Sequence, residues 1–243
     1  MSYLMLLVST GYRFWIRGEM HYSKAQGFAK KMAELYPVLA NSSARAYAKS
    51  KGQAAVQLVM FPSDRDPTKV MYWLLATPGK GLIHEREKLQ DATRVPLTWY
   101  DQYQIALTQR TRAQGGKTRW TWQIQPQRFK EYLASARDTA NSGQQALTDY
   151  FSNIAHMPMF SGIREQVKEI EQYAAKTWAK QRKSPFPQVL PESLPIMPKI
   201  QVFGDMTLDD LVAAMRKKDA DQRASAEAEA QALVADSDVL PGL

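Results

Sequence analysis

The sequence predicts an α+β fold, in which a largely antiparallel sheet carries helices on one face and is followed by a helical part and an extended Pro-rich tail. The strongest indication is residues 97–126, where apolar and polar residues alternate on either side of Gly115 and Gly116, as in a β-hairpin with one buried face. After Pro126 the apolar period lengthens to three or four residues, which indicates amphipathic helices. The order of strand, two helices, two strands, hairpin and three helices is typical of the α+β class.

The first elements follow from simple patterns. Residues 11–21 alternate between apolar and polar side chains and are expected to form a strand. Ser23 with Gln26 three residues later is a capping-box pattern that opens a helix, and Pro37 ends it. Residues 43–51 indicate a second short helix.

Two nearly continuous apolar runs, 54–61 and 69–76, are predicted as central strands covered on both faces. The TPGKG segment at 77–81 lacks the spacing of a phosphate-binding P-loop, so we interpret it as a turn. Residues 84–92 fit either a helical turn or a polar loop.

In the central hairpin, each strand is expected to bury one face. The residues on these faces are Leu97, Trp99, Tyr103, Ile105 and Leu107 in the first strand, and Trp120, Trp122 and Ile124 in the second. Three helices are predicted next, from Pro126 to Asn141, over 144–155 and over 162–183, with Ser161 placed to cap the third. The third helix has the clearest apolar stripe, formed by Ile163, Val167, Ile170, Ala174 and Trp178.

These elements predict one α+β domain over 1–183, sheet-rich over 1–126 and helical over 127–183. The five prolines between residues 184 and 206 indicate an extended tether. A short amphipathic helix over 207–218 follows, with Thr207 and Asp210 at its cap. Residues 219–243 contain few large apolar groups and are expected to be a mobile acidic tail.

Charge is spread unevenly along the chain. The formal net charge is +8, but residues 219–243 contribute −5, so residues 1–218 carry +13. A basic body with an acidic tail fits a polyanion-binding surface and a segment that screens it. The alternative is a basic protein with a solvated tail, in which the charge serves no polyanion binding.

The chain contains no cysteine, which excludes disulfides and thiolate chemistry. The apolar run from Tyr3 to Val8 is too short for a signal sequence or a bilayer span. We therefore expect a cytoplasmic protein without membrane contact.

Catalytic patterns are scarce. The histidines, His21, His84 and His156, lie far apart in sequence and outside zinc-binding motifs. Asp64 and Asp66 are candidates for magnesium only together with Asp91, and turn formation explains them as well. No nucleophile or dinucleotide motif is present. We expect a non-enzymatic protein with no metal, cofactor or small-molecule substrate.

Two binding surfaces can be proposed from the residues. Cations mixed with aromatic side chains suit nucleic acids, because phosphates pair with the cations while bases stack on the rings. This candidate surface comprises Arg13, Arg17, Arg110, Arg112, Lys117, Arg119 and Trp120, with Trp15 between the first two arginines. Trp120 also fits a core position. The second candidate is a partner-binding face on the 207–218 helix, formed by Leu208, Leu211, Val212 and Met215.

Two segments, GGKTRWTWQIQP at 115–126 and MPMFSGIREQVKEIEQYAAKTWAK at 157–180, resemble accessory proteins of conjugative plasmids and integrative elements. The nearest named group is the plasmid fertility-inhibition proteins, and the resemblance covers residues 97–183. It implies a bacterial cytoplasmic protein that acts by contact with transferring DNA or with the transfer machinery. Two hypotheses follow: a nucleic-acid-binding protein that uses the basic hairpin, or an inhibitor that docks on a transfer-machinery protein through the Pro-rich tether and the 207–218 helix.

Overall fold

The computed structural model describes residues 1–109, 116–196 and 207–237, with side chains of the last helix described as far as residue 228. It confirms the predicted α+β class, with antiparallel sheets and helices. The chain forms two compact units, which share between them the region 1–183 predicted as one domain. Unit 1 comprises Met1–Arg13 and Gln90–Val202, and unit 2 comprises Phe14–Leu89 and Phe203–Leu243.

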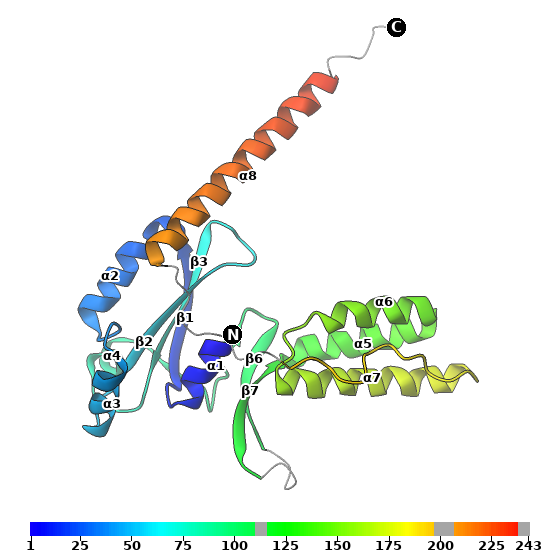
Figure 1. Ribbon diagram of the computed structural model, residues 1–243, viewed down its shortest axis with the longest axis horizontal. Coiled ribbons are helices and arrows are strands. Elements are labelled where there is room, and N and C mark those ends of the chain that lie inside the picture. The colour runs from blue at the N-terminus through cyan, green and yellow to red at the C-terminus, as the bar shows by residue number, and fades with distance from the viewer. Residues whose placement is uncertain (110–115, 197–206, 238–243) are drawn as a thin grey trace. The chain divides into compact units, whose positions relative to one another are not determined.

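Unit 2 is built on an antiparallel sheet of β1 (Phe14–His21), β2 (Val56–Pro62) and β3 (Lys69–Ala76), in which β3 pairs with both of the others (Figure 1). β3 is buried on both faces, as its continuous apolar run predicted. Gly18 of β1 lies opposite Tyr72 of β3, and a Cβ at Gly18 would meet the Tyr72 ring at 2.6–2.7 Å. The aromatic ring therefore occupies the space above the glycine.

The helices of unit 2 come mostly from predicted segments. They are η1 (Tyr22–Lys24), α2 (Ala25–Leu35), α3 (Ser42–Ser50) and α4 (Leu82–Arg86). α4 settles the open alternative at 84–92 in favour of a helical turn at its start. Met32 of α2 and Ile83 of α4 pack with Leu74 of β3 in the main core of this unit.

A second core cluster of unit 2 fixes the start of α8 (Leu208–Ser237) (Figure 1). Val212 and Met215 are buried against Tyr22, Ala25 and Val70. The Thr207–Asp210 cap is present, since the Thr207 backbone N–H donates to Asp210 and the Asp210 backbone N–H donates to the Thr207 hydroxyl. The helix begins where the sequence predicts but continues to Ser237 instead of ending at residue 218.

The acidic segment also takes part in this packing at its first residue. Asp219 is 7% exposed and accepts a hydrogen bond of 3.1 Å from the Tyr22 hydroxyl, and Arg223 pairs with the same carboxylate. Residues 221–228 are exposed. Solvation of the acidic segment therefore starts after Asp219, one residue later than the sequence indicated.

Unit 1 contains a three-stranded antiparallel sheet and the helices that follow it. The strands are β5 (Thr98–Trp99), β6 (Tyr103–Gln109) and β7 (Thr118–Ile124), with the short β4 (Gln90–Asp91) before them. The helices are α5 (Pro126–Ser142), α6 (Gln144–Ala155) and α7 (Ser161–Gln181), and α5 packs on both others (Figure 1). The predicted apolar stripe of α7 is buried along its length.

Two features of unit 1 differ from the expectations. The apolar run at the N-terminus forms a helix, α1 (Ser2–Ser9), which buries Leu4, Leu7 and Val8 and packs on β7. The first part of the Pro-rich segment packs on its own unit, since Leu190 and Leu194 are buried and Phe186 lies edge-on against Trp178 of α7. Within the described ranges, every helix is too short or too polar to span a bilayer.

Candidate nucleic-acid interface

The β6–β7 hairpin has a fixed base. Its register pairs Tyr103 with Ile124, Ile105 with Trp122 and Leu107 with Trp120, so these side chains share one face. Ile105 and Trp122 are fully buried, and the Trp122 indole N–H donates to the Met1 carbonyl oxygen at 3.1 Å.

The opposite face of β7 holds the start of α7. A Cβ at Gly162 would lie 2.6 Å from the Trp122 carbonyl oxygen, so only glycine allows this approach. The Gly162 backbone N–H donates to the Thr121 hydroxyl, which also bonds to Ser161. The sequence suggested that Ser161 caps α7. Ser161 instead contacts β7, and its side chain does not cap the helix.

Gln166 of α7 closes the free edge of β7. Its side-chain carbonyl accepts from the Ile124 N–H at 2.7 Å, and its amide donates to the Ile124 carbonyl at 3.2 Å. One side chain thus takes the place of a neighbouring strand at this position, which protects an edge that otherwise offers unpaired backbone groups.

Burial falls towards the tip of the hairpin. Leu107 is 50% exposed and its cross-strand partner Trp120 is partly exposed, whereas the neighbouring pair of Ile105 and Trp122 is completely buried. The apolar face of the sheet therefore extends beyond the core. Lys117, directly before β7, is exposed.

Arg119 lies on the other face of β7 and is already engaged within the chain. Its Nη2 donates to Glu165 Oε1 of α7 at 3.0 Å, and its Nε is buried without a hydrogen-bond partner among the described residues. The sequence placed Arg119 among the cations that would pair with the phosphates of a nucleic acid. The structure supplies an internal carboxylate for one of them.

The remaining predicted residues are distributed over the molecule. Arg110 and Arg112 lie outside the described residues. Arg13 belongs to unit 1 and pairs with Asp91 at 3.7 Å, while Arg17 is exposed on β1 of unit 2. The sequence suggested that the Trp15 ring is available for stacking. Trp15 is only 4% exposed, so its ring is not available.

The structure also places the proposed partner-binding face of the 207–218 helix. Val212 and Met215 are buried in the cluster with Tyr22 and Val70, and Leu208 and Leu211 are packed against that cluster. This chain's own unit 2 therefore covers the apolar face that the sequence offered to a partner.

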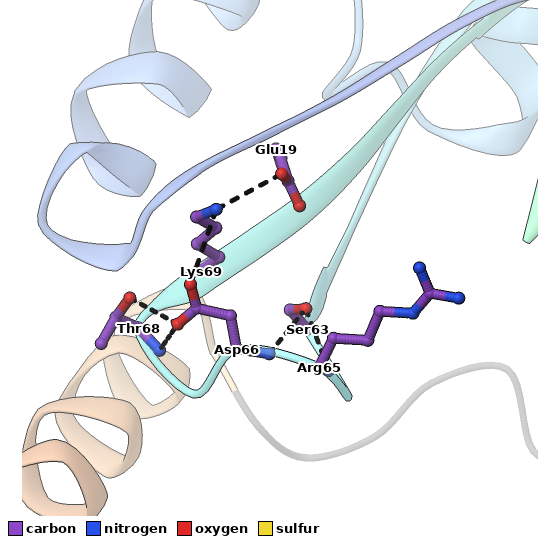
Figure 2. Close-up of polar contacts among 6 residues, drawn as sticks. All are labelled: Glu19, Ser63, Arg65, Asp66, Thr68 and Lys69. Atoms are coloured by element: carbon purple, nitrogen blue, oxygen red, sulfur yellow. Dashed lines mark hydrogen bonds and ion pairs between the residues drawn. The ribbon is translucent and has the colours of Figure 1, made fainter. Parts of the chain in front are cut away.

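Two of the aspartates considered for magnesium, Asp66 and Asp91, stabilise turns. In Figure 2, Asp66 Oδ1 accepts from the Thr68 N–H and hydroxyl at 2.9 and 2.6 Å, while Lys69 pairs with Asp66 and Glu19. The hydrogen bonds from Thr68 are the main reason that the pKa of Asp66 is lowered. Asp91 makes the same pair of bonds with Thr93. Across the described residues, no group of three or more His, Cys, Asp or Glu side chains is arranged to hold a metal ion.

The sequence did not single out Glu165, and it placed Leu107 on the buried face of the hairpin instead of at the exposed tip. Glu165 lies 46 positions from Arg119, and only the contact between Gly162 and β7 brings its helix to the hairpin. A glycine in the first turn of a strongly striped helix is a weak sign of such an approach.

No family model, curated protein or solved structure matches this chain.

Proposed function

We propose that this chain is a non-enzymatic accessory protein of a mobile genetic element that binds single-stranded nucleic acid in the cytoplasm through the tip of the β6–β7 hairpin. The observation that supports it is the change in burial along the hairpin. The Leu107–Trp120 pair is exposed or partly exposed next to the exposed Lys117, directly beyond a fully buried pair. An apolar and aromatic platform beside cations suits stacked bases and their phosphates.

Rigidity at the base of the hairpin supports the same role. α1 holds β7 on one face through Trp122, and α7 holds it on the other through Thr121. A site on a supported strand keeps its cations and rings in a fixed arrangement, which reduces the ordering cost of binding. Arg119 adds a cation whose Glu165 partner is largely exposed, so a phosphate can replace that partner at small cost.

The test is the salt dependence of binding to a labelled oligothymidylate, measured by fluorescence anisotropy. Each phosphate contact contributes about −0.7 to the slope of log K against log salt for single strands. Changing the four cations of the hairpin tip to Gln should weaken binding and reduce the slope by roughly three units, because four contacts are lost. These cations are Arg110, Arg112, Lys117 and Arg119.

A matched control removes four exposed cations from the helices of the same unit, Lys130, Lys168, Lys176 and Lys180. This variant has the same net charge as the hairpin variant and should keep most of the parent's slope. Equal slopes in the two variants would remove the hairpin from the proposal. Absence of binding by the parent at low salt would end it.

The second candidate is an inhibitor of conjugative transfer that binds a transfer-machinery protein, as the fertility-inhibition resemblance implies. Its proposed docking face is packed within unit 2, and the described part of the Pro-rich segment is packed on unit 1. The hairpin retains its exposed groups. We therefore place nucleic-acid binding first.

A further inference from the structure

Helix α3 of unit 2 does not contribute to the core. None of its nine residues is buried. An isolated helix shorter than about 12–15 residues is marginal in water, so a helix of this length without burial depends on other support.

Local caps supply this support. The Asn41 side chain accepts from the Ala44 N–H at 2.8 Å. At the other end, Gly52 has φ +70°, the Gly52 N–H donates to the Lys49 carbonyl, and the Gln53 N–H donates to the Ala48 carbonyl. This is a Schellman motif. Both ends of α3 are thus fixed while its side chains remain at the surface.

The surface that α3 presents is cationic and aromatic. Tyr47 is 65% exposed, and the Lys51 ammonium lies 5.5 Å from its ring centroid. Arg45 and Lys49 are on the same helix, and the sequence has no acidic residue between Glu34 and Asp64.

The TPGKG turn lies against the C-terminal end of α3. A Cβ at Gly79 would meet the backbone of Gly52, Gln53 and Ala54 at 2.7–2.8 Å, and the Lys80 N–H donates to the Gly52 carbonyl. This close contact explains why the TPGKG turn has a glycine at residue 79, and no phosphate-binding loop is needed to account for it. It also adds Lys80, which is exposed, to the cations at this end of the helix.

We propose that α3 and the TPGKG turn form a second contact surface for single-stranded nucleic acid, with a base stacked on Tyr47 and phosphates on Lys49, Lys51 and Lys80. The inference rests on the proposed function for its ligand but not on the hairpin for its site. The balance of groups favours this ligand over a protein, because lysine is depleted in protein–protein interfaces whereas cations beside a ring are the usual components of single-strand sites.

The lysines are tested by changing Lys49, Lys51 and Lys80 to Gln. The change should reduce the salt slope by about two units, at 0.7 per contact. The control changes Lys130, Lys168 and Lys180 to Gln, which removes the same charge from unit 1. Both variants should melt at the parent's temperature, since all six side chains are exposed.

The ring is tested separately. Tyr47→Ala should weaken binding to oligothymidylate roughly 5- to 150-fold, the range that follows from about 1–3 kcal/mol for one stacked base. Tyr47→Phe should bind like the parent, because the proposed contact uses the ring and not the hydroxyl. Ultraviolet cross-linking to an oligonucleotide that carries 5-bromodeoxyuridine should label the peptide containing Tyr47.

The outcomes separate this inference from the proposed function. Loss of slope in the α3 variant but not in the hairpin variant supports the α3 surface and overturns the hairpin site. An α3 variant that behaves like its control, while the hairpin variant is impaired, overturns the α3 surface alone. A parent that binds no oligonucleotide at low salt overturns both. Binding of polyglutamate that is tighter than binding of oligothymidylate and lost in the α3 variant overturns the nucleic-acid ligand and assigns the surface to acidic proteins.

Discussion

At the scale of single residues, Gly162 is the position where the smallest change should have a large effect. The ideal Cβ position lies 2.6 Å from the Trp122 carbonyl oxygen, and this backbone atom belongs to a strand held on both faces. Gly162→Ala should therefore reduce the free energy of unfolding by about 1–3 kcal/mol, the usual cost of overpacking, as measured by urea denaturation.

Gly27 of α2 provides the control for this substitution. Gly27 also lies in a helix, but it is exposed, and a Cβ added there meets nothing within 4 Å. Gly27→Ala should stabilise the protein by roughly 0.5–1 kcal/mol, because alanine is the better helix former. Equal effects of the two substitutions would contradict the close approach of α7 to β7.

Tyr36 links stability to alkaline pH. It is 3% exposed and its hydroxyl donates to Glu87 at 2.5 Å; burial first, and then this hydrogen bond, raise its pKa from 10 to about 12. Below pH 10 the phenol is neutral in both states. Between pH 10 and 12 the unfolded chain loses the proton that the folded protein retains, so stability falls as pH rises.

Tyr36→Phe removes this titration. The variant should be about 1 kcal/mol less stable at pH 7, because the hydrogen bond to Glu87 is lost. It should then lose less stability than the parent between pH 10 and 12, as measured by urea unfolding at each pH. Some loss remains, since the pKa of Tyr103 is also raised to about 12, chiefly by burial. Parallel pH profiles for the parent and the variant would refute the role given to Tyr36.

At the scale of elements, local patterns predicted most helices and strands. The stripe of α7 and the alternation of β6 and β7 required no knowledge of their neighbours. The α7 stripe, Ile105, Trp122 and Ile124 are buried as the period selected, whereas Leu107 is exposed and Thr121 is buried on the opposite face of β7. α1 was missed because its apolar run has no clear stripe, and its burial depends on a strand more than 100 residues later. α8 was placed correctly at its start, where it has a cap and an apolar face. Its extension beyond residue 218 is rich in alanine and has few large apolar residues in its sequence, so no amphipathic pattern marks it.

The docking of α8 on unit 2 can be tested with two substitutions on adjacent residues. Met215 is 6% exposed in the cluster with Val70, whereas Ala214 is exposed. Met215→Asp buries a charge without a partner and should destabilise the docked helix by several kcal/mol. Hydrogen exchange should then lose protection in residues 208–219, while Ala214→Asp, with the same charge, should retain it. Unchanged exchange in Met215→Asp would show that this cluster does not hold the helix.

The candidate site was only partly predictable. The hairpin and the face that Trp120 shares with Trp122 and Ile124 follow from the alternation of apolar and polar residues. The ion pair of Arg119 with Glu165 does not, because it depends on how closely α7 approaches β7. For the same reason, the sequence could not show that Trp15 is buried while Tyr47 is exposed. Both are aromatic residues beside cations, and only the packing distinguishes them.

At the scale of the whole molecule, chain order does not reveal the division into units. The first 13 residues belong with the hairpin and its helices, and α8 belongs with the N-terminal sheet. Such pairings join segments that are distant in sequence, and no local period encodes them. The contacts that make them are specific side-chain bonds, such as Trp122 to Met1 and Tyr22 to Asp219.

Charge is the property that acts over the whole chain. Deletion of residues 225–243 removes four acidic residues and no basic one, which raises the formal net charge from +8 to +12. The cut keeps Asp219 and Arg223, so the bond from Tyr22 and the docking of α8 are preserved and the melting temperature should remain close to the parent's. If the acidic segment screens the basic body, the truncated protein should bind oligothymidylate more tightly at low salt, and the difference should shrink as salt rises.

A full-length variant with the four acids changed to their amides should reproduce the gain, because the effect depends on charge and not on chain length. Equal affinities of the parent and both variants at low salt would show that the acidic segment does not screen the binding surface.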